Sequence, residues 1–236
     1  MTNSGRVSGR TEGCPVQRAW FLTICLMVAA SLPALDTDPV LSGDFWVEVD
    51  PFVETEAGYQ LTGDESRIQI LEEARYVFSG IIYGFDFVYT PSDNLRDVDE
   101  IFSFEAIARI PWGDPALTIV ETWVDGNLMH ANVRYFPSGH QLRWLSMMQS
   151  NIYHNATASG RASMFVGTGA KYDAVTEGAK EAIRAHLRSR VLNKPKEVRG
   201  SVALTGAPYI IIDAGEYLAR VDVRIDVDEI IPYRIF

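Results

Sequence analysis

The chain has 236 residues, of which 47% are hydrophobic, and it carries a formal net charge of −10 at pH 7. A chain of this length can bury a hydrophobic core as one domain or as two small ones. The acidic balance argues against binding to nucleic acid or to anionic lipid, because such binding depends largely on Lys and Arg side chains that neutralise phosphate groups.

Residues 1–34 predict a secretory signal. Arg18 precedes a short apolar run, 19–30, and small residues follow it. This order is typical of a signal, and the run is shorter than the about 20 apolar residues of a membrane-spanning helix. We therefore expect cleavage after Ala34, a periplasmic or secreted chain, and no stable membrane span after cleavage. An uncleaved anchor or a buried helix is the alternative, and translation from a later start such as Val16 stays open.

Both cysteines, Cys14 and Cys25, lie in this leader. Ile24 is too large for the position before a lipidated cysteine, so a lipoprotein is not expected. The mature chain should hold no disulfide, no reactive thiolate and no cysteine metal site. The leader contains three arginines and one glutamate, so its loss changes the net charge from −10 to −12.

Alternating apolar and polar residues predict strands at 44–50 and 85–90. Between them, apolar side chains at helical spacing predict a helix over about 64–82. Asp64 is the expected N-cap of this helix, and Gly84 is expected to end it.

Residues 94–102 are interpreted as one short helix. Strands are predicted at 102–110 and 117–125. The sequence Asp125-Gly126-Asn127 then indicates a hairpin, because Gly and Asn tolerate positive φ. Its partner strand is expected at 128–136.

Residues 141–163 are ambiguous between strand and helix, and 162–167 predict a strand. A second helix is expected at about 172–191, ending before Pro195. Its small residues at near i, i+4 spacing form a flat stripe that lets a backbone approach a sheet closely: Ala174, Gly178, Ala182 and Ala185.

The clearest pattern in the chain is the alternation over 217–229, which predicts an antiparallel strand with one buried and one solvated face. The predicted fold class is α+β, with two main helices packed on antiparallel sheet. An N-terminal α+β region at 35–160 and a C-terminal helix with strands at 161–236 are expected. Two similar modules, or one continuous domain, both remain open.

The stretch around Gly167 and Gly169 resembles a phosphate-binding loop only in part. A dinucleotide loop has a third glycine where this chain has Tyr172, and a Walker loop has Ser or Thr after its lysine. We therefore interpret the glycines as a tight turn, with Asp173 supporting the start of the helix. No cofactor is expected.

No catalytic or metal-ligating set stands out. The histidines show no metal spacing on one element and are interpreted as unrelated surface residues: His130, His140, His154 and His186. Gly-x-Ser-x-Gly is absent from the sequence. The acidic residues of the last strand are interpreted as a solvated face rather than a calcium site: Asp226, Asp228 and Glu229.

One cluster of basic residues contrasts with the net negative charge of the chain. It lies on and after the second helix: Lys180, Arg184, Arg188, Arg190, Lys194, Lys196 and Arg199. A solvated helix face is one interpretation, and a docking patch for an acidic partner, led by Arg184 and Arg188, is the other. Four aromatic residues near turns are further candidates for a protein interface: Trp112, Tyr135, Phe136 and Trp144.

The segments "FVGTGAKYDAVTEGAKEAIRAHLRSRV", "VRGSVAL" and "YLARVDVRIDV", within 162–228, resemble the N-terminal domain of the flagellar assembly protein T family and related outer-membrane lipoprotein domains. The resemblance implies a non-enzymatic periplasmic protein attached to an envelope machine or filament. We expect an exported protein that acts through contacts with another envelope or filament protein, or with itself. A small-ligand-binding module and an envelope hydrolase, which needs a histidine beside an acid in a cleft, are the alternatives.

Overall fold

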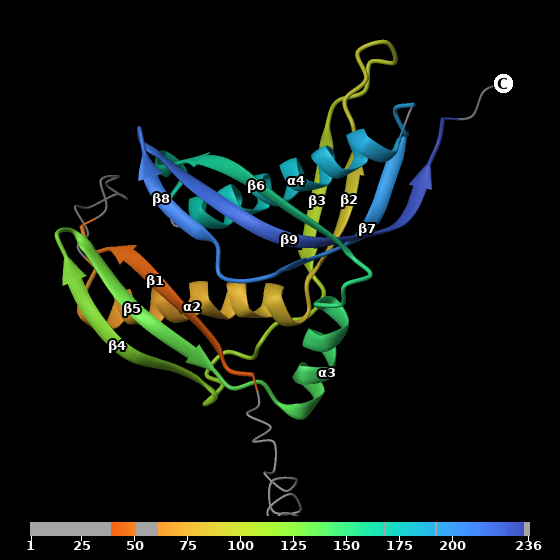
Figure 1. Ribbon diagram of the computed structural model, residues 1–236. Helices are drawn as coiled ribbons and strands as arrows, with labels where there is room; N and C mark the ends of the chain where they lie inside the picture. Colours follow the sequence, from red (N-terminus) through yellow and green to blue (C-terminus); the bar gives the residue numbers. More distant parts are fainter. Residues whose placement is uncertain (1–38, 51–60, 168, 192, 234–236) are drawn as a thin grey trace, which may run out of the picture. The chain divides into compact units, whose positions relative to one another are not determined.

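The computed structural model describes residues 39–50, 61–167, 169–191 and 193–233. The predicted leader, 1–34, lies outside the described residues. Two antiparallel sheets organise the chain from Pro39 onward (Figure 1). Sheet A has the strand order β1-β5-β4 and consists of β1 (Leu41–Glu48), β4 (Leu117–Asp125) and β5 (Leu128–Tyr135).

Sheet B has the order β3-β2-β7-β9-β6. The strand β8 pairs with the first residues of β9, whereas β7 pairs with the later residues of that strand. Its strands are β2 (Phe85–Thr90), β3 (Ile101–Ala106), β6 (His154–Ser163), β7 (Glu197–Leu204), β8 (Tyr209–Asp213) and β9 (Glu216–Ile231). Strands from the expected N-terminal region, 35–160, and from the expected C-terminal region, 161–236, therefore belong to the same sheet.

Among the described residues, three α-helices accompany the sheets: α2 (Gly63–Ile82), α3 (Gly139–Met148) and α4 (Ala170–Arg190). The helix α2 packs against β1, and α4 packs against β6 and β9 (Figure 1). This arrangement confirms the predicted α+β fold with two main helices on antiparallel sheets. Within the described residues, no helix is both long and apolar enough to cross a membrane.

The stripe of small residues on α4 explains how closely this helix approaches sheet B. Ala174, Gly178 and Ala182 are buried. A Cβ added to Gly160 of β6 would lie 2.1 Å from the backbone nitrogen of Gly178. The predicted stripe is therefore confirmed at three positions and wrong at Ala185, which is exposed because it lies on the outer side of the helix.

A buried apolar cluster extends across both sheets. In sheet A, the ring of Phe45 meets that of Phe78 on α2 edge to face, with centroids 5.6 Å apart. In sheet B, Phe85 of β2 stacks on Phe104 of β3 at 4.3 Å. The predicted alternation in β9 is confirmed, because its inward side chains from Ala219 to Ile225 are buried.

Three local predictions are wrong. The N-cap of α2 is Thr62 rather than Asp64, because Thr62 and Glu65 form a reciprocal capping box. Residues 94–102 are not a helix: the carboxylate of Asp93 accepts hydrogen bonds from the Leu95 backbone and the Arg96 side chain and so holds a turn before β3. The expected strand at 162–167 ends at Ser163 and becomes the 3₁₀-helix η1 (Met164–Val166).

Candidate anion-binding cleft

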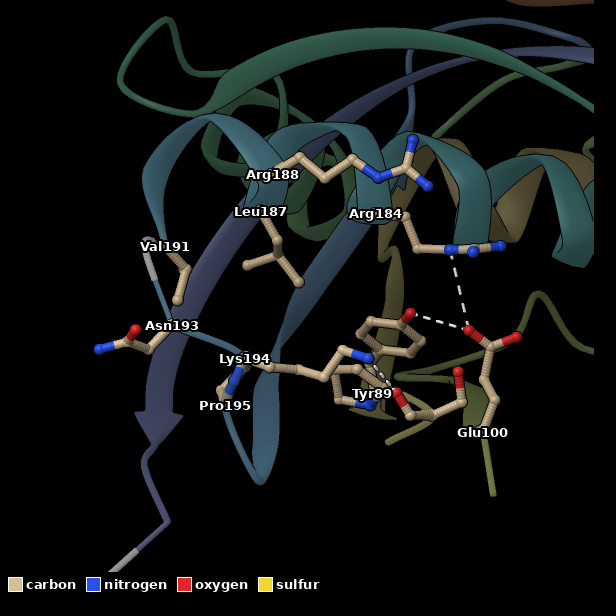
Figure 2. A pocket seen from close by; sticks show the side chains of 11 residues that line it. Tyr89, Glu100, Arg184, Leu187, Arg188, Val191, Asn193, Lys194 and Pro195 are labelled. Carbon is tan, nitrogen blue, oxygen red and sulfur yellow. Dashed lines mark hydrogen bonds and ion pairs between the residues drawn. The ribbon is translucent and has the colours of Figure 1, made fainter. Parts of the chain in front are cut away.

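A cleft of about 380 Å³ lies between the C-terminal half of α4, the connection that follows this helix, and the end of β2 with the turn after it (Figure 2). The helix contributes Arg184, Leu187 and Arg188 to its wall. The connection after the helix contributes Lys194 and Pro195, and sheet B contributes Tyr89. The helix α4 ends at Arg190, because Val191 has an extended backbone, and the connection that follows it forms part of the cleft wall.

Glu100 is the acidic residue of the cleft wall, and its charge is already neutralised. Its carboxylate accepts a hydrogen bond of 2.8 Å from the Tyr89 hydroxyl. It also lies 3.7 Å from the Arg184 guanidinium and 3.5 Å from the Lys180 ammonium. Burial raises the pKa of Glu100, but the hydrogen bond from Tyr89 and the two cations outweigh it and lower the pKa below its usual value.

Arg188 is the available cation of this cleft. Arg184 is shared between Glu100 and Glu181, and Lys194 donates a hydrogen bond to the carbonyl oxygen of Ser92. The Arg188 side chain is exposed and has no ion pair or hydrogen bond with any described residue. A guanidinium binds a carboxylate well because it offers two parallel N–H donors.

A second cleft of about 720 Å³ adjoins the first and shares Lys194 and Pro195 with it. It adds the cations Arg96 and Arg190 to the same end of α4. Arg96 lies 4.2 Å above the ring of Tyr233. Five basic side chains therefore surround the two clefts in a chain whose overall charge is negative.

The structure brings two of the predicted interface residues, Arg184 and Arg188, to the cleft. The predicted aromatic residues line neither cleft. Trp112 and Phe136 are 56% and 53% exposed, and Trp144 is half-buried against Tyr83.

The hypothesis that Tyr135 belongs to an exposed interface is wrong, because its side chain is only 1% exposed. Its hydroxyl donates to Asp114 at 3.1 Å and accepts from Gln141 at 2.6 Å. These bonds hold the end of β5 against the first turn of α3.

The start of α4 is built around a buried ion pair rather than an exposed phosphate-binding lysine. Gly167 has a φ of 104° and makes the expected turn. The Lys171 ammonium contacts Glu73 of α2 at 3.1 Å, donates to the Trp46 carbonyl oxygen, and lies 3.6 Å from the Trp46 ring centre. Burial lowers the pKa of Lys171 and raises that of Glu73, and their mutual attraction opposes both shifts.

The histidines are not all unrelated surface residues. The ring of His186 on α4 is 5% exposed and lies 4.2 Å from the ring of His154 on β6, measured between ring centres. His130 stacks separately on Trp123 in sheet A. No group of three or more potential metal ligands occurs in the part of the chain that the structure describes.

A sequence comparison finds a relative that aligns with most of this chain. An uncharacterized protein of Treponema pallidum (strain Nichols) is 27% identical over 207 residues, which cover 85% of this chain and 87% of that protein. No solved structure matches the chain. A protein-family model matches residues 30–233, which include both sheets and both clefts, and the chain therefore belongs to the family that this model describes.

Proposed function

We propose that this is an exported, non-enzymatic protein that acts through protein–protein contacts, as a structural or accessory component of a bacterial cell-envelope or flagellar assembly. In this proposal the cleft at the C-terminal end of α4 receives an acidic segment of the partner. The single observation that carries the contact site is the exposed guanidinium of Arg188, which lies among other cations and has no partner among the described residues.

Charge complementarity selects the kind of partner. Arg188 and Lys194 line the cleft, and the acid on its wall, Glu100, is already paired with Tyr89, Arg184 and Lys180. A carboxylate of the partner would find an unneutralised cation here. The net charge of the whole chain is negative and would repel the same segment, so attraction to this cleft would also set the orientation of binding.

The proposal that the protein is exported is based on its predicted leader, residues 1–34. Its cationic flank, short apolar run and small-residue exit support passage across a membrane before α2 and the sheets fold. The resemblance of 162–228 to flagellar and outer-membrane lipoprotein domains supports a place in the envelope.

A small anionic ligand is the second candidate for the same cleft. Its volume of about 380 Å³ falls in the range of about 300–1,000 Å³ that small-molecule sites occupy. Tyr89 and Leu187 offer apolar contacts beside Arg188.

Cross-linking in intact cells, followed by purification and mass spectrometry, tests the proposal. We expect a recurrent envelope protein with the wild-type chain and its loss with Arg188→Glu. The matched control is Arg220→Glu, which reverses an exposed charge on β9 away from the cleft. Equal recovery with both variants would contradict the contact site, and a clean monomer in every sample would contradict the assembly role.

A further inference from the structure

His154 and His186 come from elements that the fold holds in fixed positions. His154 begins β6, where it pairs with the buried Ile225 of β9, so its side chain lies on the face that α4 covers. His186 belongs to α4, which the glycine contact at Gly160 presses against β6. The two imidazoles are therefore neighbours because of backbone packing.

Both rings lack hydrogen-bond partners. Among the described residues, neither imidazole makes a hydrogen bond to protein, and Nδ1 of His186 is buried without a partner. A buried polar atom without a partner costs about 1–3 kcal/mol. The pair thus holds ring nitrogens that have no hydrogen-bond partner among the described residues.

The separation of the rings suits one shared ion. A metal ion lies about 2.0–2.1 Å from a ligating ring nitrogen. Two ring centres are then about 4.5 Å apart at the right angle of a tetragonal Cu²⁺ site, and about 5.2 Å apart at the tetrahedral angle of a Zn²⁺ site. The ring centres here are 4.2 Å apart and the planes are tilted by 36°. His154 is the exposed ring of the pair, so it is the ring that would rotate to bring a nitrogen toward the ion.

We propose that His154 and His186 form a two-nitrogen site for a divalent transition-metal ion such as Zn²⁺ or Cu²⁺, with solvent completing the coordination. Imidazole nitrogen suits these ions, whereas Mg²⁺ and Ca²⁺ select oxygen ligands. Burial, His154 and Arg190 lower the pKa of His186 to about 4, so this ring keeps its lone pair at neutral pH.

Arg190 sets the expected strength of the site. Its charge lies close enough to His186 to disfavour a second positive charge there, and no carboxylate makes a hydrogen bond or ion pair with either ring among the described residues. Binding should therefore be weaker than in a site with three or four protein ligands. Replacing Arg190 by alanine should strengthen binding of the ion.

Calorimetric titration with Zn²⁺ tests this site. The full chain should carry Cys14→Ser and Cys25→Ser, because thiolates in the leader would compete for the metal. We expect one ion per chain, and an affinity loss of at least about tenfold for His154→Ala, since even outer partners of a ligand cause such losses. His130→Ala, in sheet A, should leave the affinity unchanged.

Cu²⁺ electron paramagnetic resonance gives a second readout that a structural effect would not reproduce. Two imidazole nitrogens should couple to the ion in the parent chain and one in His154→Ala. Because His154 is exposed at the start of a strand, this variant should remain folded, which thermal unfolding would verify. The absence of saturable binding in the parent chain, or equal affinity and equal spectra in His154→Ala, would overturn the proposal.

Discussion

Replacing Gly160 by alanine tests whether α4 packs directly on the backbone of β6. The new Cβ would lie 2.1 Å from the Gly178 nitrogen and 2.2 Å from the Ala174 carbonyl oxygen, where ordinary contact requires 3.4–4 Å. The helix would have to retreat by about 1 Å or more along its central turns. Because the clashing atoms are backbone atoms, no side-chain rotation can relieve the contact.

The expected loss in the free energy of unfolding follows from this contact with rigid backbone atoms. Overpacking a core costs typically about 1–3 kcal/mol, and we expect Gly160→Ala to lie at or above the upper end. Gly178→Ala should cost less, about 1 kcal/mol, because its Cβ would lie 2.9 Å from a methyl group of Val221 and 3.2 Å from its nearest backbone atom, the Gly160 nitrogen. Gly139→Ala is the matched control, since nothing lies within 4 Å of its added Cβ.

Equilibrium urea unfolding measures these three variants against the wild-type chain. A loss of about 3 kcal/mol should lower the midpoint by about 1–3 M without changing the slope. The control should be unchanged or slightly more stable, because alanine restricts the unfolded chain. Equal midpoints for Gly160→Ala and Gly139→Ala would refute the packing of α4 described here.

Three further predictions concern charge and processing. Lys171→Met should destabilise the chain by about 3–5 kcal/mol, because it leaves Glu73 buried without its partner; adding Glu73→Leu should recover part of this loss in a double-mutant cycle by chemical denaturation. The pKa of His186 is lowered to about 4 in the folded chain, so between pH 6.5 and 4 this side chain binds fewer protons in the folded than in the unfolded state. The free energy of unfolding therefore decreases as the pH falls through this window. Wild-type stability should therefore fall by about 2 kcal/mol more than that of His186→Leu between pH 7 and pH 5, measured by denaturation at each pH. N-terminal sequencing of the exported protein should begin at Leu35, and a sequence that begins upstream would contradict the predicted cleavage.

Local patterns in the sequence sufficed for the regular elements. The alternation in β9 and the helical spacing over 64–82 depend only on neighbours along the chain, and the structure confirms both. The helix α3 could also have been found, because Ser138 and Gln141 form a capping box whose spacing is visible in the sequence. Short apolar runs around it obscured that signal.

Contacts between side chains that are far apart in the sequence could not be predicted in the same way. The neighbourhood of His154 and His186 depends on the register of β6 with β9 and on where α4 crosses them. The buried pair of Glu73 and Lys171 joins residues 98 positions apart. By contrast, Arg184 and Arg188 lie one turn apart on one helix, so their shared place at a cleft was accessible from spacing alone.

A photo-cross-linking residue at position 188, in cells that naturally make the protein, would test whether the cleft at the end of α4 binds an acidic segment of a partner protein. The same residue at position 220, on β9, serves as the matched control. We expect position 188, but not position 220, to capture one recurrent envelope protein through a segment rich in Asp and Glu, and added salt to reduce the yield. Capture of the same proteins at both positions, or of none at position 188, would contradict it.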